Sequence, residues 1–176
     1  MNNETNILKT VFSAKLFAVK HVQKTLPDGS EKTYELIDIQ NAVTILAIDA
    51  DQDIYLVEQY RIGPDRPLLE LPAGKIEPEE EPLEAARREL REEIGMDAAE
   101  IKSLGSFYMT PGYANEFMHC FLATGLYMSP LAPDADEFIH VRKIPKNQLF
   151  AMIDAGEIQD AKTLAVLILA KGYLES

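Results

Sequence analysis

The stretch GKIEPEEEPLEAARRELREEIGM, residues 74–96, decides the fold because it contains a helix with both ends marked. Pro82 suits the first helical position, where its missing N–H is not needed, and Gly95 suits the C-terminal stop. Apolar residues at helical spacing form one stripe that would face a core. These residues are Leu83, Ala86, Leu90 and Ile94. We therefore predict an amphipathic helix over about residues 82–94.

Three carboxylates lie beside this stripe. Glu89, Glu92 and Glu93 share a second helical face, since successive residues turn by about 100°. Like charges at this spacing destabilise a helix by roughly a few tenths of a kcal/mol per pair unless something neutralises them. A hard divalent cation such as Mg²⁺ prefers oxygen ligands and would neutralise such a cluster. The alternative is a solvated, glutamate-rich surface helix, which is common in acidic proteins.

Residues around this helix could complete a cation site. Arg88 precedes one of the three acids by one helical turn and could orient it through a bidentate ion pair. Glu80 lies in the loop before the helix and could fold back onto the same face. Pro72 and Gly74 flank Ala73, which suggests a tight turn that could aim the carbonyl oxygen of Ala73 at a metal.

Strands and helices alternate through the rest of the chain. Residues 10–40 predict a β-hairpin that turns at the PDGS segment, and the apolar run AVTILAI at residues 42–48 predicts a buried strand. Further strands are expected at residues 54–60, 101–109, 116–124 and 137–144, and helices at 146–155 and 160–173, the last with Asp160 as N-cap. Interspersed strands and helices favour an α+β fold, a mixed β-sheet flanked by helices.

Composition narrows the function classes. The 176 residues include 17 Lys and Arg against 29 Asp and Glu, a formal net charge of −12. Such a surface repels phosphate backbones, so we expect no nucleic-acid partner. No apolar run is long enough to cross a bilayer, and the N-terminus lacks the layout of a signal peptide. We therefore expect no membrane partner and a cytoplasmic protein.

The cysteine and the histidines predict no chemistry of their own. Cys120 lies within FMHCFLA and is interpreted as a small buried hydrophobe. A single cysteine also excludes a disulfide within the chain. His21, His119 and His140 are far apart in sequence and show no ligand spacing, so each is interpreted as a strand residue.

The spacing within residues 74–96 resembles the Nudix box, and every defining position matches: Gly, five residues, Glu, seven residues, Arg-Glu-Leu, one residue, Glu-Glu, one residue, Gly. In Nudix hydrolases this loop–helix–loop binds divalent cations and lies against a mixed sheet between helices, an α/β/α sandwich. The resemblance implies that Mg²⁺, with Mn²⁺ as the alternative, is held by the side chains of Glu89, Glu92 and Glu93 and by the carbonyl oxygen of Ala73. The further roles implied are catalysis for Glu92, Glu93 and Arg88, and support of the loop and helix for Gly74, Glu80, Arg88 and Gly95.

Both flanks resemble ADP-ribose pyrophosphatases and related nucleotide-sugar hydrolases. Upstream, residues 57–74 contain the QYR and ELPAG segments of that subfamily, and downstream, residues 111–116 match its PG-x-x-x-E segment. Pro111 falls 16 residues after Gly95, which matches the proline position of the same subfamily. The resemblance spans nearly the whole chain and is weakest over residues 1–40.

The resemblance also implies substrate-binding residues. Arg61, in the QYR segment, offers a planar fork for a phosphate or ribose, against the alternative of a surface ion pair. Glu116, in the PG-x-x-x-E segment, would bind sugar hydroxyls, against the alternative of a plain strand-edge acid. Glu70 would add a carboxylate beside the site. Because the chain has no tryptophan, stacking on the base is assigned to Tyr34, with Phe12 and Phe17 as alternatives.

In this subfamily the general base that positions the attacking water usually comes from a loop before a late strand. The corresponding loop is PDADEFI, residues 133–139, which contains Asp134, Asp136 and Glu137. Glu137 matches best because it lies just before the F-I-x-V strand. The alternative is that these acids belong to a solvated turn.

These inferences lead to one preferred function and two alternatives. The preferred function is Mg²⁺-dependent hydrolysis of ADP-ribose, or a close ADP-sugar, to AMP and a sugar phosphate. The first alternative keeps the chemistry and changes the substrate to GDP-mannose or another nucleotide sugar. The second is a non-catalytic Nudix domain that senses ADP-ribose. By resemblance, residues 1–40 are strands that help to build a homodimer, and residues 41–176 form the Nudix hydrolase domain.

Overall fold

The computed structural model describes residues 6–133 and 138–174 of the chain. Contacts divide the chain into two compact units. The first contains residues 1–41 and 107–117, and the second contains residues 42–106 and 118–176. The helix predicted within residues 74–96 therefore belongs to the second unit.

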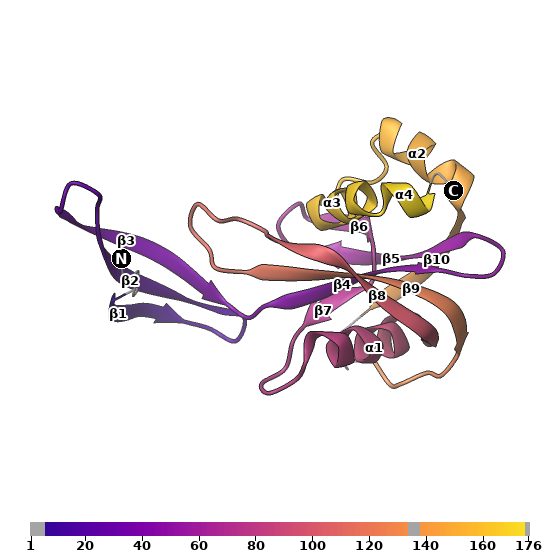
Figure 1. Cartoon of the computed structure of the whole chain (residues 1–176), viewed down its shortest axis with the longest axis horizontal. Coiled ribbons are helices and arrows are strands. Elements are labelled where there is room, and N and C mark those ends of the chain that lie inside the picture. Colours follow the sequence, from indigo (N-terminus) through magenta and orange to yellow (C-terminus); the bar gives the residue numbers. More distant parts are fainter. Residues whose placement is uncertain (1–5, 134–137, 175–176) are drawn as a thin grey trace. The chain divides into compact units, whose positions relative to one another are not determined.

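The first unit is built on an antiparallel sheet in the order β1-β2-β3 (Figure 1). Its strands are β1 (Asn6–Ser13), β2 (Phe17–Thr25) and β3 (Glu31–Ile39). The hairpin predicted at the PDGS turn joins β2 to β3, and the N–H of Leu26 donates to the carbonyl of Ser30 over 2.7 Å. The separate strand β1 was not predicted, because the turn before β2 contains Ala, Lys and Leu and no Gly, Pro, Asn or Asp to mark it.

A segment far along the chain completes the first unit. The N–H of Ile37 in β3 donates to the carbonyl of Tyr113 over 2.8 Å, and the N–H of Asn115 donates back to the carbonyl of Ile37 over 3.2 Å. The side-chain oxygen of Asn115 also accepts from the N–H of Ile39 over 2.9 Å. The PG-x-x-x-E segment is therefore bound to β3 on both sides of Ala114.

The second unit contains a mixed sheet. Among the described residues its path runs β10-β5-β4-β9-β8, with β6 paired to β5 and β7 paired to β4. The strands β4 and β9 are parallel, while β4 and β10 each pair with β5 in antiparallel fashion. The strand bounds are β4 (Ala42–Ile48), β5 (Asp53–Arg61), β6 (Arg66–Glu70), β7 (Ala73–Lys75), β8 (Met96–Tyr108), β9 (Phe117–Met128) and β10 (Ile139–Pro145).

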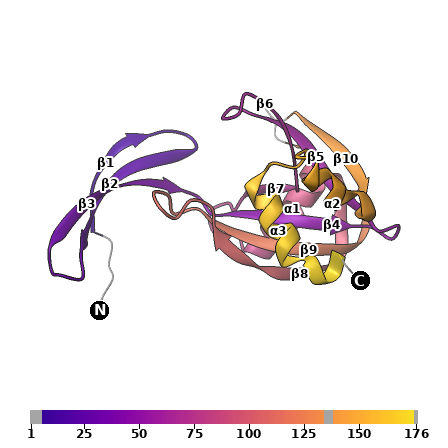
Figure 2. The ribbon, with the colours of Figure 1, turned by 90° about the horizontal axis from the view of Figure 1, so that it is seen from above.

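Helices cover both faces of this sheet, so the predicted α+β sandwich is confirmed. The helix α1 (Pro82–Glu93) lies on one face, and α3 (Ala161–Leu169) with the short α4 (Lys171–Leu174) lies on the other (Figure 1). Seen from above, α3 crosses over β4, which it contacts (Figure 2). The remaining helix is α2 (Lys146–Asp154). Every residue of β4 is buried, as its continuous apolar run predicts.

The face that α1 buries differs in part from the predicted stripe. Leu90 is buried against β4, as expected, but Leu83 is 40% exposed. The rest of the predicted stripe, Ala86, Leu90 and Ile94, is buried, and a second buried row lies beside it at Ala85, Glu89 and Glu93. The prediction for Leu83 was wrong because this residue lies in the exposed first turn, and the buried face of the helix extends instead to two of the carboxylates.

The C-terminal helical region begins as predicted and ends differently. The carboxylate of Asp160 accepts from the N–H of Thr163 over 2.9 Å, which confirms Asp160 as the N-cap of α3. The single helix expected over residues 160–173 is interrupted at Ala170, which separates α3 from α4. No helix in the described part of the chain is long and apolar enough to span a membrane.

Candidate active site

The loop that leads into α1 lies directly against a carboxylate of the helix. A Cβ atom placed on Gly74 would lie 1.9 Å from Oε1 of Glu89 and 2.1 Å from its Cδ. Both distances are far inside van der Waals contact, so only glycine leaves room for this side chain. The Glu89 carboxylate is 7% exposed and therefore rests on the backbone of the loop.

Arg88 connects the loop to the acids of the helix. Its Nε donates to Oε1 of Glu80 over 2.9 Å and its Nη2 donates to Oε2 of Glu80 over 3.0 Å. The same Nη2 donates to the carbonyl of Lys75 over 2.9 Å. Its Nη1 donates to Oε1 of Glu89 over 2.7 Å and to Oε2 of Glu92 over 2.9 Å. One guanidinium therefore fixes three carboxylates and the backbone of β7.

These contacts keep the group ionised. The hydrogen bonds that Arg88 donates to Glu80 raise the pKa of Arg88, and those to Glu89 and Glu92 raise it further, which outweighs the effect of burial. Reciprocally, the hydrogen bond from Arg88 lowers the pKa of Glu80. Charge pairing thus compensates the cost of bringing several acids together beside the sheet.

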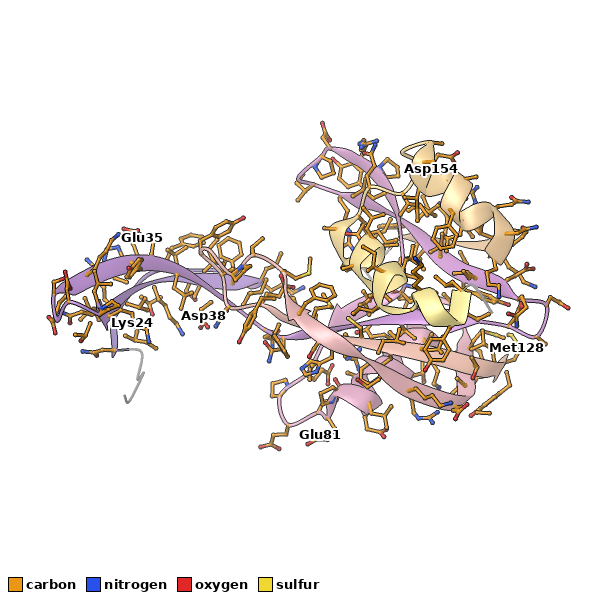
Figure 3. The ribbon with its side chains drawn as sticks, turned by 45° about the horizontal axis from the view of Figure 1, so that its top comes forward. Lys24, Glu35, Asp38, Glu81, Met128 and Asp154 are labelled. Carbon is orange, nitrogen blue, oxygen red and sulfur yellow. The ribbon has the colours of Figure 1, made fainter. Side chains whose placement is uncertain are left out.

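Glu93 ties the end of α1 to the same loop. Its Oε2 accepts from the backbone N–H of Ala73 over 2.9 Å, and its side chain is buried with 6% exposure. Glu93 lies one turn after Glu89 on the buried row of α1, whose N-terminal boundary Glu81 is labelled in Figure 3. The two carboxylates therefore reach the loop at Ala73 and Gly74, the first two residues of β7.

A second charged network lies beside this loop. At the end of β5, Nε of Arg61 donates to Oε1 of Glu70 over 2.8 Å, and Nη2 donates to Oε2 over 2.6 Å. Lys162, in the first turn of α3, also donates to Oε2 of Glu70. The hydrogen bonds with Glu70 raise the pKa of Arg61, and the negative charge of Glu93 raises it further. Arg61 therefore lies within the electrostatic reach of Glu93 on α1.

Residues 38–167 match the family model described as NUDIX domain. The chain belongs to the Nudix family.

The matched relatives carry the names of pyrophosphatases and hydrolases of nucleotide compounds. The chain is 33% identical over 165 residues to an ADP-ribose pyrophosphatase of Bacillus subtilis strain 168, covering 93% of this chain and 89% of that protein. It is 34% identical over 193 residues to a GDP-mannose pyrophosphatase of Citrobacter koseri, covering 100% of this chain and 97% of that protein. The fold also matches the crystal structure of an ADP compounds hydrolase with a TM-score of 0.84 and 28% identity, over 98% of this chain and 95% of that one. These similarities identify the chain as a Nudix hydrolase of nucleoside diphosphate compounds.

The structure brings the Nudix-box residues together around one loop. Glu80, Glu89 and Glu92 share Arg88, and Glu93 holds Ala73. Gly95, which follows the helix, has a φ of 71°, a left-handed backbone conformation that favours glycine and ends α1. Their catalytic and metal-binding roles stay predictions.

The donor set suits a hard divalent cation, which Nudix pyrophosphatases generally need. Glu89, Glu92 and Glu93 offer carboxylate oxygens, the ligands that such ions prefer. Within residues 6–133 and 138–174, however, no three Asp, Glu, His or Cys side chains are grouped closely enough to ligate one ion. Arg88 and the N–H of Ala73 hold these carboxylates instead. Binding of one ion by all three acids would therefore require their carboxylates to come closer together.

The two predicted substrate residues of the second unit, Arg61 and Glu70, bind each other. Arg61 thus forms an ion pair, as the alternative to ligand binding expected, but its partner Glu70 is buried with 1% exposure. The Arg61 side chain is 38% exposed, and its Nη1 donates to none of the described residues. One edge of the guanidinium is therefore engaged by Glu70, and the other is available to a ligand.

The remaining predicted residues belong to the first unit or lie outside the described residues. Tyr34, on β3, is 37% exposed, and Nζ of Lys32 lies 4.9 Å from the centre of its ring. Glu116 is half-buried and follows Asn115, which is bound to β3. Asp134, Asp136 and Glu137 lie outside the described residues. The roles of Tyr34, Glu116 and Glu137 stay predictions.

Sequence reasoning missed Lys162. It is buried with 7% exposure and pairs with Glu70 and with Asp160. A signal was present, because Lys162 is the only charged residue in the apolar stretch AKTLAVLIL of α3. A charge on a buried helix is rare unless it is paired.

Proposed function

We propose that the protein hydrolyses the pyrophosphate bond of ADP-ribose, or of a close ADP-sugar, to AMP and a sugar phosphate with Mg²⁺. The observation that supports this proposal best is the close approach of Glu89 to Gly74, since it packs a helix carboxylate onto the loop of the Nudix box. The likeness to an ADP-ribose pyrophosphatase over 93% of the chain supports the ADP-sugar substrate.

Different residues of the chain would perform the separate steps of this reaction. A divalent cation, when bound, neutralises charge on the phosphoryl oxygens and lowers the pKa of a water molecule. Glu89, Glu92, Glu93 and the carbonyl oxygen of Ala73 would hold it. Arg88 keeps two of these acids oriented through its Nη1. The outer edge of Arg61 would bind the diphosphate or ribose, and Glu137 would orient the attacking water as general base.

A second candidate function is hydrolysis of GDP-mannose, favoured by the 34% identity to a GDP-mannose pyrophosphatase over the whole chain. The metal site and the bond cleaved would be the same, and only the base and sugar contacts would differ. Ranking kcat/KM over a panel of ADP-ribose, other ADP-sugars and GDP-mannose separates the two. A higher kcat/KM for GDP-mannose than for every ADP-sugar would replace the first proposal by the second.

The central test is product analysis with the purified full-length chain, ADP-ribose and Mg²⁺. We expect AMP and ribose phosphate in equal amounts, and we expect Glu93→Gln to lower kcat/KM by about 100-fold because it removes a ligand charge. Glu100→Gln is the matched control, since Glu100 is exposed and pairs with the nearby, similarly exposed Lys102 on β8. Mn²⁺ in place of Mg²⁺ tests the choice of metal.

Two outcomes would contradict this proposal. Binding of ADP-ribose without release of AMP would favour the sensing function over catalysis. Full activity of Glu93→Gln would remove the metal assignment while leaving the reaction in place.

We also infer that the protein is a cytoplasmic homodimer. Residues Ile7, Leu8, Val11 and Phe12 of β1 are each about half exposed, which supports an association through the first unit. The net charge of −12 supports a small-molecule substrate over nucleic acid. Light scattering coupled to size-exclusion chromatography measures the assembly directly.

A further inference from the structure

Lys162 is a buried cation at the start of α3, with no place in the proposed reaction described so far. Its Nζ donates to Oε2 of Glu70 and lies 3.0 Å from Oδ2 of Asp160. The side chain is 9% exposed. Burying an ammonium group is costly unless its charge is paired, and both partners here are carboxylates.

Glu70 links Lys162 to Arg61. Its Oε2 accepts from both cations, while its Oε1 accepts from Nε of Arg61 alone. Burial favours the neutral form of Glu70, but the hydrogen bonds from Arg61 and the charge of Lys162 outweigh it and lower its pKa. A single ionised carboxylate, 1% exposed, therefore lies between two cations whose positions depend on one another.

The same turn of α3 also holds the backbone next to Glu70. Oγ1 of Thr163 accepts from the N–H of Leu71 over 2.9 Å and donates to Oδ2 of Asp160 over 2.6 Å. Leu71 is two residues before Ala73, whose N–H donates to Glu93. The first turn of α3 thus binds the side chain of Glu70, at the end of β6, and the backbone of the next residue, Leu71.

We propose that Lys162 is a positioning residue: by fixing the Glu70 carboxylate it holds the Arg61 guanidinium with its Nη1 edge presented to the diphosphate of the substrate. Glu70 engages only one edge of Arg61, so the direction of the free edge follows the plane of the carboxylate. Lys162 sets the plane of the Glu70 carboxylate. If Arg61 were the only cation bound to Glu70, the carboxylate and the guanidinium could rotate together. This inference rests on the proposed function, in which Arg61 contacts the substrate.

A double-mutant cycle in the full-length protein tests this inference. Lys162→Met keeps the aliphatic stem and removes the charge, Arg61→Ala removes the guanidinium, and the third variant combines them. We expect Lys162→Met to raise KM for ADP-ribose about tenfold, with kcat changed much less, and to add less than about twofold in the Arg61→Ala background. Lys162→Arg should recover part of the loss, because it restores a donor to Glu70.

Lys102→Met is the matched control, since Lys102 is exposed and pairs with Glu100 on β8. A purely structural Lys162 would lower the melting temperature and leave KM unchanged, which would overturn the inference. An equal rise in KM in both backgrounds would overturn it too, because the effect would not pass through Arg61. If Lys162→Met does not fold, Lys162→Gln, which removes the charge but keeps a donor for Glu70, enters the same cycle; a smaller rise in KM that is lost in the Arg61→Ala background is then expected, and an unchanged KM or an equal rise in both backgrounds would overturn the inference.

The same double-mutant cycle can be measured without hydrolysis, by calorimetric titration of each variant with ADP-ribose in the absence of metal. Wild-type protein that binds but does not hydrolyse ADP-ribose contradicts the proposed function, and the cycle in Kd then decides the role of Lys162. Wild-type protein that neither binds nor hydrolyses any ADP-sugar overturns both. Active wild-type enzyme with additive variants overturns the positioning role alone.

Discussion

The contact between Gly74 and Glu89 shows how one missing side chain shapes the loop. A methyl group at residue 74 and the carboxylate of Glu89 would have to share the same space, at 1.9 Å. The backbone of β7 pairs with Thr44 and Val43 of β4, so it cannot easily retreat. The helix side chain would move instead and lose the orientation that Arg88 gives it.

Gly74→Ala should therefore lower the affinity for the activating metal by about 10- to 100-fold. Folding should be affected less, because the Glu89 side chain can turn toward solvent while the core of α1 stays packed. Activity titrated against Mg²⁺ gives the apparent affinity, and circular dichroism gives the melting temperature.

Gly172→Ala is the matched control for this substitution. A Cβ atom on Gly172 meets no heavy atom within 4 Å, and the residue lies in α4. Alanine should be neutral or slightly stabilising there. An unchanged Mg²⁺ dependence of Gly74→Ala would show that the Glu89 position does not matter for metal binding.

At the scale of residues, the sequence predicted the box contacts better than the surrounding ones. Arg88 pairs with Glu92, and Glu80 folds back toward the same face, as expected, because one loop and one helix of known spacing fix all three residues. Glu70 and Lys162 are 92 residues apart, and their pairing depends on how α3 lies across the sheet. Local periodicity contains no information on such a contact, so the partner of Arg61 could not be predicted.

Among the elements, α1 shows where the helical pattern was insufficient. Two neighbouring rows were available, one from Leu83 and one from Ala85, and both have helical spacing. Packing on the sheet buries the first row except Leu83 and also buries the second row, which includes Glu89 and Glu93. A prediction from apolar periodicity places acidic residues in solvent. It therefore fails for a helix face on which Glu89 and Glu93 are buried against a loop. The short strand β7 was missed for a related reason, since three residues show no period.

The start of α3 allows a test of one cap. Asp160→Ala should destabilise the protein by about 1–2 kcal/mol, because the N–H of Thr163 loses its acceptor and Lys162 loses a charge partner. Asp160→Asn should cost about half as much, since asparagine caps helices nearly as well as aspartate. Urea unfolding measured by circular dichroism gives both free energies.

Asp154→Ala is the control for this pair of variants. Asp154 is exposed at the C-terminal end of α2 (labelled in Figure 3), where a negative charge is not stabilised by the helix dipole. Its removal should change the free energy of unfolding by less than about 0.5 kcal/mol. Equal losses for the Ala and Asn variants at residue 160 would assign the whole effect to the ion pair and none to the cap.

The whole molecule should lose stability in acid. Hydrogen bonds from Arg88 lower the pKa of Glu80, and the cations around Glu70 lower its pKa despite burial, both from an ordinary value of 4.5. A lowered folded-state pKa means that the stabilisation is complete above the unfolded value and disappears as the pH falls through the folded value. The free energy of unfolding should therefore fall progressively as the pH drops below about 4.5.

Urea unfolding across this range measures the effect, and Glu80→Gln provides the comparison. The variant should be less stable at neutral pH and should lose less on acidification, because one of the shifted groups is gone. Parallel pH profiles for the wild type and Glu80→Gln would contradict the assignment of the shift to the pair with Arg88.

Chemical labelling of Cys120 can detect opening of the sheet in the second unit. The thiol lies in the middle of β9 with no exposed surface, and burial raises its pKa to about 12. While the sheet is intact, a thiol reagent in solution cannot reach the Cys120 side chain, and the thiol is not ionised to the reactive thiolate. Since the chain has no other cysteine, each labelled molecule records one passage through a conformation in which β9 has parted from its neighbours. The rate of labelling therefore measures how often the sheet that packs against α1 opens, and the measurement needs no introduced probe.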